Sequence, residues 1–163
     1  MANQLTTALA MVHQLPSFLR NRARNVALRR AVPFLGTAKL RFHQTEQDVW
    51  EVSVRNKRRV QNHLGQIHAC VMVLLAETIG VMICTHNMPG DRIPLVKKLD
   101  AQFVRRSQGD MRAIVRLDEA QRQHIVDNEK GEMDLQVTVT DESGEEPVLV
   151  TVTTAWIPKQ RRT

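Results

Sequence analysis

A run of eighteen residues, 67–84, contains a single charged side chain, Glu77, and limits the possible folds more than any other feature of the chain. A continuous apolar segment of this length is too long for a strand and indicates a helix. Because apolar residues occupy all its sides, the helix must be enclosed by other parts of the protein. A membrane-spanning helix has a similar length, but the central carboxylate and the lack of flanking aromatic residues favour a buried helix.

Segments with alternating apolar residues lie on both sides of this helix in the sequence. The alternation predicts two strands before the helix and three or four after it, over residues 38–42, 49–54, 93–106, 111–117, 135–139 and 148–152. Asp118 is a good N-cap for a short additional helix. Because antiparallel strands usually bury one face, we predict an α+β fold in which a curved antiparallel sheet wraps around the long central helix.

The net charge of +6 comes from the N-terminal part of the chain. Residues 1–45 contain seven Lys or Arg and no acid, whereas the other 118 residues contain sixteen Lys or Arg and seventeen Asp or Glu. Apolar residues at helical spacing predict a basic amphipathic helix, with Pro16 as a kink or break, at Leu5, Leu9, Val12, Leu15, Leu19, Ala23 and Val26. We therefore divide the chain into an N-terminal helical arm, residues 1–32, and one domain, residues 33–163.

The basic arm permits other interpretations. An Arg-rich, acid-free segment is somewhat like an import signal, and a basic amphipathic helix can also contact an anionic membrane surface; a structural helix is favoured over both. Nucleic-acid binding is not predicted, because the chain has no Tyr, four Phe, two Trp and no groove-reading motif to accompany its basic residues.

Both cysteines, Cys70 and Cys84, lie in the apolar run. They are expected to be reduced residues of the core, which favours a reducing compartment and a cytoplasmic protein. The spacing around them is not that of metal ligands, so no metal site is predicted.

The residue types alone leave the role of Glu77 open. Desolvation should raise the pKa of a carboxylate in an apolar helix, which suits a general base, but a structural ion pair with an Arg or His of a strand explains Glu77 equally well. The amides at the start of the helix suit an oxyanion. Asn62 and Gly65 are also common at helix ends, and this simpler interpretation, a cap and a turn, is favoured on residue type.

Helix geometry relates Glu77 to the start of its helix. Glu77 follows Ala69 by eight residues, which corresponds to about 12 Å along the axis. One helix cannot bring Glu77 to its own first amides, whereas the antiparallel helix of a two-fold partner can. If these groups form one site, the site must lie between subunits and occur twice in a dimer.

The segment from Asn62 to Glu77 resembles the hotdog-fold acyl-CoA thioesterases. The residues that carry the resemblance are "NHLGQIH", of the form N-x-x-G-x-[IL]-H, and an acid nine residues after His68. The nearest branch is the phenylacetate-pathway thioesterase, and an uncharacterised hotdog group shares "NHxGxIHA…AE" and a leading "PFLG". The element order from about Pro33 to Ile157 is compatible, so the resemblance implies a hotdog fold with an extra N-terminal helix.

The resemblance also implies roles for five residues. Asn62 helps to position the attacking water or the thioester, Gly65 forms the turn, and His68 supports the loop and the thioester end of the site. The backbone N–H of Ala69 donates to the thioester carbonyl. Glu77, contributed by the other subunit, acts as general base or nucleophile.

Two positions depart from the pattern of the family. His68-Ala69-Cys70 replaces the common His-Gly-Gly, and Glu77 replaces the Asp that is more usual in this branch. Such changes shift reacting groups on the scale of about 1 Å, to which rates are sensitive. A non-catalytic hotdog module that binds an acyl-CoA or another fatty ligand is therefore the alternative function. A hotdog dehydratase is disfavoured, because its "Phe-Pro…Met-Pro-Gly" context is absent near His68.

The implied substrate is an acyl-CoA thioester, and no separate cofactor is expected. Basic side chains suit the phosphates of coenzyme A, and the candidates for this role are Arg58, Arg59, Arg105 and Arg106. The implied assembly is a homodimer or a dimer of dimers. The length of the acyl chain is not specified by the sequence.

Overall fold

The computed structural model describes residues 17–159. Its elements in chain order are α2 (Ser17–Ala31), α3 (Pro33–Ala38), β1 (Arg41–Thr45), β2 (Val49–Val54), the 3-10 helix η1 (Arg58–Val60), α4 (Ala69–Asn87), β3 (Arg92–Phe103), β4 (Met111–Arg116), α5 (Glu119–Asp127), β5 (Gly131–Asp141) and β6 (Val148–Pro158).

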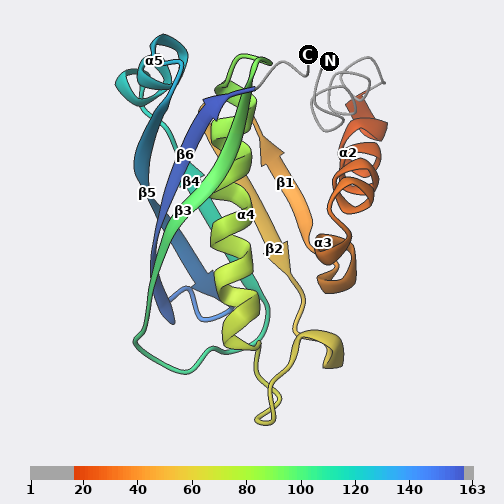
Figure 1. Cartoon of the computed structure of the whole chain (residues 1–163). Helices are drawn as coiled ribbons and strands as arrows, with labels where there is room; N and C mark the ends of the chain where they lie inside the picture. Colours follow the sequence, from red (N-terminus) through yellow and green to blue (C-terminus); the bar gives the residue numbers. More distant parts are fainter. Residues whose placement is uncertain (1–16, 160–163) are drawn as a thin grey trace.

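The strands form one six-stranded antiparallel sheet in the order β1-β2-β4-β5-β6-β3. The sheet curves around α4, which crosses its inner face (Figure 1), and α4 contacts β2, β3, β4, β5 and β6. The predicted α+β architecture, a curved antiparallel sheet around a long central helix, is therefore confirmed.

Burial against the sheet holds α4 in place. Leu75, Ile79 and Ile83, which recur every four residues, are fully buried in the core that the strands share. A Cβ added at Gly80 would lie 3.2 Å from the Cβ of Val152 on β6, so this glycine allows the helix and the sheet to approach closely. By length and composition α4 passes for a membrane span, but its burial identifies it as the core helix of this sheet.

Some boundaries differ from those expected from sequence, for local reasons. The central helix starts at Ala69 instead of Ile67, because Ile67 forms an antiparallel bridge with Gln61. Ala38, expected at the start of a strand, ends the short helix α3. The other predicted strands are present with shifted ends, and Asp118 caps α5 with a reciprocal capping box. The helical positions predicted at Leu5, Leu9, Val12 and Leu15, and the break at Pro16, lie outside the described residues.

One edge of the sheet, strand β1, is covered by α2. Asn25 on α2 donates to the carbonyl oxygen of Phe42 (2.9 Å) and accepts from its N–H (2.8 Å). The Arg29 guanidinium donates twice to the carbonyl oxygen of Leu40 (2.8 and 2.7 Å). The side chains of α2 thus supply partners that an edge strand otherwise lacks, and Leu28 of α2 is fully buried. The predicted boundary between arm and domain at residue 32 stays a prediction.

The opposite edge, strand β3, is paired on one side only. It runs antiparallel to β6 from Arg92 opposite Pro158 to Phe103 opposite Val148. Its other side has no strand partner in the part of the chain that the structure describes, and several of its large apolar residues are exposed, namely Ile93, Leu95, Val96 and Phe103. A long edge with exposed apolar side chains is a surface that favours pairing with another strand.

Asp141, at the end of β5, links the connection between β3 and β4 to the loop between β5 and β6. Its buried carboxylate accepts hydrogen bonds from Arg105 Nη1 (2.9 Å), from the Gln108 N–H (2.8 Å) and from the N–H and hydroxyl of Ser143 (2.9 and 2.6 Å). Burial alone would raise the pKa of Asp141, but the hydrogen bonds from Ser143 and Gln108 and the charge of Arg105 together hold it below its usual value.

Replacing Asp141 with asparagine should lower the free energy of unfolding by about 2 kcal/mol at neutral pH, because a charged acceptor of buried hydrogen bonds is lost. Since the folded state lowers the pKa of Asp141, the ionised group stabilises the fold above its unfolded-state pKa and loses this contribution as the pH falls through the folded-state value. Urea unfolding at a series of acidic pH values should therefore show that the difference in free energy of unfolding between wild type and Asp141→Asn becomes smaller as the pH falls.

The matched control is Asp48→Asn, since Asp48 is exposed and its carboxylate has no partner among the residues described. This control should change the free energy of unfolding by less than about 0.5 kcal/mol. Equal stability of the two variants at neutral pH would contradict the role given to Asp141.

Candidate active site

Asn62 organises the loop that leads into α4. Its side-chain Oδ1 accepts hydrogen bonds from the N–H groups of Leu64 (2.9 Å) and Gln66 (3.1 Å), and its own N–H donates to the Gln66 carbonyl (2.8 Å). Asn62 does not cap α4, so the simpler interpretation of this residue is wrong. Its amide nitrogen Nδ2 has no acceptor among residues 17–159 and remains able to donate to another molecule.

Gly65 turns the same loop with a φ of +72°, in the left-handed region that glycine adopts readily. Asn56 anchors the turn, because its Nδ2 donates to the Gly65 carbonyl (3.1 Å). Asn56 is itself held by Gln61, which donates to its Oδ1 (3.0 Å), and by Asp110, which accepts from its N–H (2.8 Å). A lone Asn in a basic segment has no pattern that marks it, so Asn56 was not predicted.

The first turn of α4 is capped by His68, whose Nδ1 accepts from the Cys70 N–H (3.1 Å). This bond places the proton of the neutral ring on Nε2, and His68 is exposed. The His68 N–H donates to the Val60 carbonyl (2.8 Å), which closes the loop at its base. The N–H of Ala69, at the first helical position, has no acceptor within the described chain. The helix start therefore offers one unpaired donor, which the helix dipole makes more positive.

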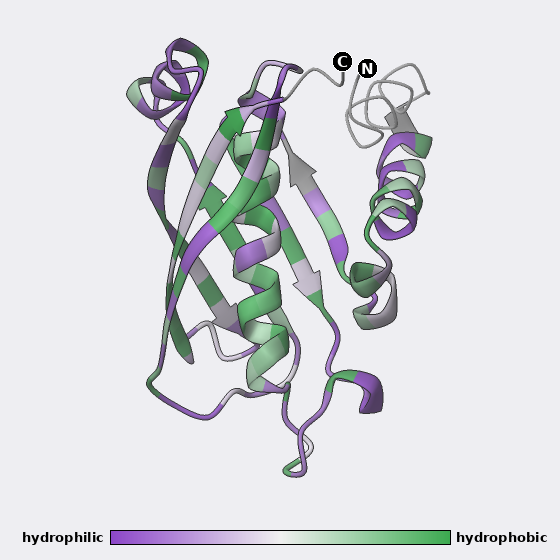
Figure 2. Ribbon diagram, in the orientation of Figure 1, coloured by the Kyte–Doolittle hydropathy of each residue, from purple (hydrophilic) through white to green (hydrophobic). Residues whose placement is uncertain are grey.

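Glu77 lies on the face of α4 that the sheet leaves partly uncovered. This face is a stripe of half-buried or exposed residues at helical spacing, Cys70, Val73, Leu74, Glu77, Val81 and Thr85. Figure 2 shows α4 as mostly hydrophobic with a hydrophilic turn partway along its length. Burial raises the pKa of Glu77. No Arg, Lys or His of the described residues forms an ion pair with it, so the structural ion pair considered from the sequence is not formed there.

The structure brings four of the five predicted catalytic residues together. Asn62, Gly65, His68 and Ala69 belong to one hydrogen-bonded loop at the start of α4. Glu77 is eight residues farther along the same helix, which places it about 12 Å from Ala69 along the axis. A single chain therefore holds the two halves of the candidate site apart.

The four arginines considered for phosphate binding do not form one cluster. Arg58 and Arg59 are exposed on η1, whereas Arg105 and Arg106 lie in the connection between β3 and β4. Arg105 is engaged with Asp141 and also donates to the hydroxyl of Ser143 (3.2 Å). Of the four, only Arg59 lines the basic cavity described below.

The two cysteines differ in environment. Both are free thiols. Cys84 is buried, and burial raises the pKa of its thiol to about 12, so it stays protonated and unreactive. Cys70 was expected in the core, but it is exposed, because it lies on the uncovered stripe of α4.

Solved structures of several bacterial proteins have the same fold. The protein PA5026 of Pseudomonas aeruginosa, described as a probable thioesterase, is 23% identical over 89% of this chain and 97% of its own, with a TM-score of 0.75. A mutant form of the thioesterase PA1618 from the same organism is 16% identical over 83% and 93%, with a TM-score of 0.69. The thioesterase HI1161 of Haemophilus influenzae is 16% identical over 79% and 85%, with a TM-score of 0.65.

These similarities identify the fold as the hotdog fold of the thioesterases, as the resemblance implied. The phenylacetate-pathway branch stays a prediction. Among proteins with curated descriptions, none matches the chain significantly. The sequence model described as "Domain of unknown function (DUF4442)" matches residues 20–157, most of the chain. The chain therefore belongs to the DUF4442 family and has a hotdog fold.

Proposed function

We propose that this protein hydrolyses acyl-CoA thioesters at sites formed between two subunits. The observation that carries the proposal is the state of Glu77, a half-buried carboxylate on an uncovered helix face, with a raised pKa and no ion-pair partner in the described chain. A carboxylate that contributes no structural pair and has a raised pKa is suited to accept a proton from water.

The proposed dimer forms through strand β3. Pairing of two β3 strands about a two-fold axis covers the exposed apolar edge of each sheet and continues the sheet from one subunit into the next. The two α4 helices then lie side by side and antiparallel, with their half-buried stripes in contact. In this arrangement Glu77 of one subunit approaches Ala69 of the other, and two equivalent sites result. A pair of such dimers keeps the same sites.

The proposed reaction uses groups from both subunits. Glu77 takes a proton from a water molecule while the water oxygen attacks the thioester carbon. The electron pair of the C=O bond moves to the carbonyl oxygen, where the Ala69 N–H stabilises the negative charge. When the C=O bond re-forms, the C–S bond breaks, and the coenzyme A thiolate leaves and takes up the proton held by Glu77. The products are a carboxylic acid and free coenzyme A.

Asn62 and His68 hold the substrate end of the site. The Nδ2 of Asn62, which has no acceptor within residues 17–159, is available to donate to the thioester or to the water. Its Oδ1 is used by the loop itself, which fixes the direction of the amide. His68 keeps the first turn of α4 capped and its Nε2–H exposed.

The Glu77→Gln variant should lose acyl-CoA hydrolysis by on the order of 10²-fold or more, because the amide cannot accept the proton. In the wild type, kcat/KM should fall as the pH drops through the pKa of Glu77, above the ordinary glutamate value of 4.5, since burial raises that pKa. The kcat/KM of the Glu77→Gln variant should not show this fall at low pH. Hydrolysis of a panel of acyl-CoA chain lengths, followed by release of the free thiol, measures both effects.

The variant should remain folded. A carboxylate with a raised folded-state pKa destabilises the fold when it is ionised, so Glu77→Gln should keep or raise the free energy of unfolding at neutral pH. Glu46→Gln, at an exposed position outside the loop and α4, serves as the activity control. A Glu77→Gln variant as active as wild type would overturn the proposal, and acyl-CoA binding by a wild type without turnover would favour the non-catalytic module instead.

Subunit mixing tests the shared site directly. Glu77→Gln and Asn62→Ala should each be nearly inactive alone. A hybrid dimer has one intact site, with Glu77 from the Asn62→Ala chain and Asn62 from the Glu77→Gln chain. Random mixing of equal amounts should restore about a quarter of the wild-type rate, measured after co-expression with two different tags.

The control for this experiment mixes Glu77→Gln with the double variant Glu77→Gln/Asn62→Ala. No hybrid of these two chains has an intact site, so the rate should not recover. If mass spectrometry shows hybrids of the first pair and their activity is no higher than that of this control, the site does not lie between subunits.

A further inference from the structure

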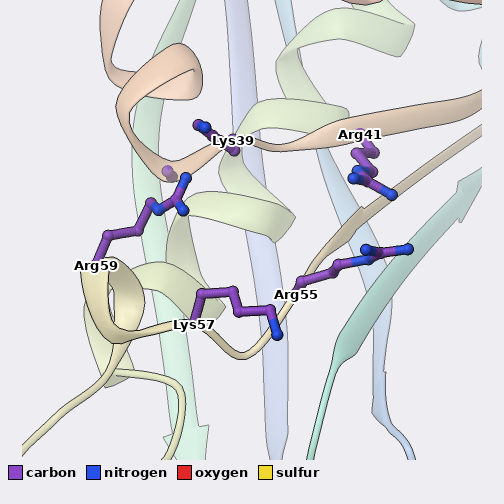
Figure 3. Close-up of a pocket in the computed structure, with 6 residues that line it drawn as sticks. Lys39, Arg41, Arg55, Lys57 and Arg59 are labelled. Carbon is purple, nitrogen blue, oxygen red and sulfur yellow. The ribbon is translucent and has the colours of Figure 1, made fainter.

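A basic cavity of about 210 Å³ lies beside the loop that leads into α4. One wall of the cavity is the corner between α3 and β1. The other wall is the segment that runs from the end of β2 into η1. The lining residues are Ala38, Lys39, Arg41, Arg55, Lys57 and Arg59. Figure 3 shows Lys39 and Arg41 reaching it from one side and Arg55, Lys57 and Arg59 from the other. Five of the six lining residues are cationic and none is acidic.

The five cations of this cavity have no anionic partner. None takes part in an ion pair, and none donates a side-chain hydrogen bond, within residues 17–159. A neighbouring hollow shares Arg41 and Arg55, but it also contains acidic residues, Asp110 and Glu142 among them. Two hollows along α2 are also free of acidic residues, but they hold three arginines and two, against five cations in the first cavity.

One cation of the cavity, Arg41, also acts on a neighbouring group, Arg29 of α2. The pKa of Arg29 is lowered mainly by burial, and the positive charge of Arg41 lowers it further. Like charges repel one another and attract anions, and all five cations of the cavity are exposed and accessible to a ligand.

The backbone fixes the shape of the cavity on both of its walls. Lys39 has a φ of +56° and a ψ of 44°, and it is the one non-glycine residue with a positive φ in the described chain. Helices commonly end in this left-handed conformation, and Lys39 ends α3, with its N–H directed at the carbonyl oxygens of Leu35 and Gly36. On the other wall, Val60 accepts from the His68 N–H (2.8 Å) and Asn56 donates to the Gly65 carbonyl (3.1 Å). The cavity and the candidate active-site loop are thus built on one hydrogen-bonded segment.

We infer that this cavity binds the phosphate groups of a phosphorylated ligand, and that the ligand is the nucleotide end of the coenzyme A thioester. The identification of coenzyme A rests on the proposed function, whereas the phosphate chemistry rests on the cavity itself. Guanidinium groups bind phosphate oxygens in pairs, and lysines act as compact charges. Five cations suit a ligand with several phosphates better than a single carboxylate. The phosphates bound here place the pantetheine arm beside the loop of Asn62 and Ala69.

The cations come from segments that no sequence motif connects. Arg55, Lys57 and Arg59 belong to one basic stretch, but Lys39 and Arg41 precede it by more than a dozen residues. The pairing of β1 with β2, which sets Arg41 opposite Ser53, and the packing of α3 against η1 bring the two groups together. This set replaces Arg58, Arg105 and Arg106 as the proposed phosphate ligands and retains Arg59.

The test is calorimetric binding to the full-length wild type and to the double variant Arg55→Gln/Arg59→Gln. The probes are coenzyme A, its 3′-dephospho form, pantetheine and inorganic pyrophosphate. Wild type should bind coenzyme A more tightly than the dephospho form and pantetheine least, and pyrophosphate should compete with coenzyme A. The double variant should lose on the order of tenfold or more in affinity for coenzyme A, with its affinity for pantetheine unchanged.

The control is Arg116→Gln/Lys130→Gln, which removes the same charge at exposed positions outside the cavity. Its affinity for coenzyme A should match that of wild type. An equal loss in both double variants, or no loss in Arg55→Gln/Arg59→Gln, would overturn the cavity assignment. Pyrophosphate that binds without displacing coenzyme A would overturn the identity of the ligand.

These outcomes are independent of turnover. If wild type hydrolyses acyl-CoA and the cavity variants bind coenzyme A with unchanged affinity, the proposed function holds and the assignment of the cavity is wrong. If the cavity variants weaken phosphate-dependent binding but wild type hydrolyses no acyl-CoA, the assignment of the cavity holds and the proposed thioesterase activity is wrong.

Discussion

The enclosure of α4 by the sheet is the constraint on which the rest of the molecule depends. Leu75, Ile79 and Ile83 lose all contact with water against the strands, and burial of each such side chain contributes about 1.5–3 kcal/mol. The same packing fixes the rotation of the helix about its axis. That rotation decides which residues remain on the uncovered stripe and leaves Glu77 there without an ion-pair partner in the described chain. The position of the carboxylate is thus a result of core packing.

A second set of interactions, the hydrogen bonds of the loop before α4, gives the helix start its chemistry. Asn62, Gly65 and His68 satisfy the polar groups of the loop, and they leave the Ala69 N–H without an acceptor in the part described. Asn56 connects this loop to the basic cavity on its outer side. Because one segment of chain carries both features, a ligand that fills the cavity is held in a defined direction relative to the helix start.

Much of the fold was predictable, because its signals are local in sequence. The apolar run and the alternation of residues such as Val148, Val150 and Val152 directly indicate a buried helix and half-buried strands. The error in the helix boundary arose where pairing within a loop overrides the apolar pattern: Ile67 stays outside the helix because it pairs with Gln61, six residues earlier. In the candidate site, the motif marked residues that are close in sequence. The bond of Arg105 to Asp141, 36 residues later, and the meeting of Lys39 with Arg59 exist only in the folded chain and have no sequence signal.

The two edges of the sheet are treated differently, and this difference limits how the protein can assemble. Asn25 of α2 occupies the outward N–H and carbonyl of Phe42 on strand β1, and Arg29 occupies the carbonyl of Leu40 just before the strand. Strand β3 has no partner on its outer side within residues 17–159. A sheet with two open edges can add copies at both ends and grow into a fibre. With one edge occupied, strand addition stops after a single pairing. The helix α2 thus prevents a further strand from adding to the sheet at β1.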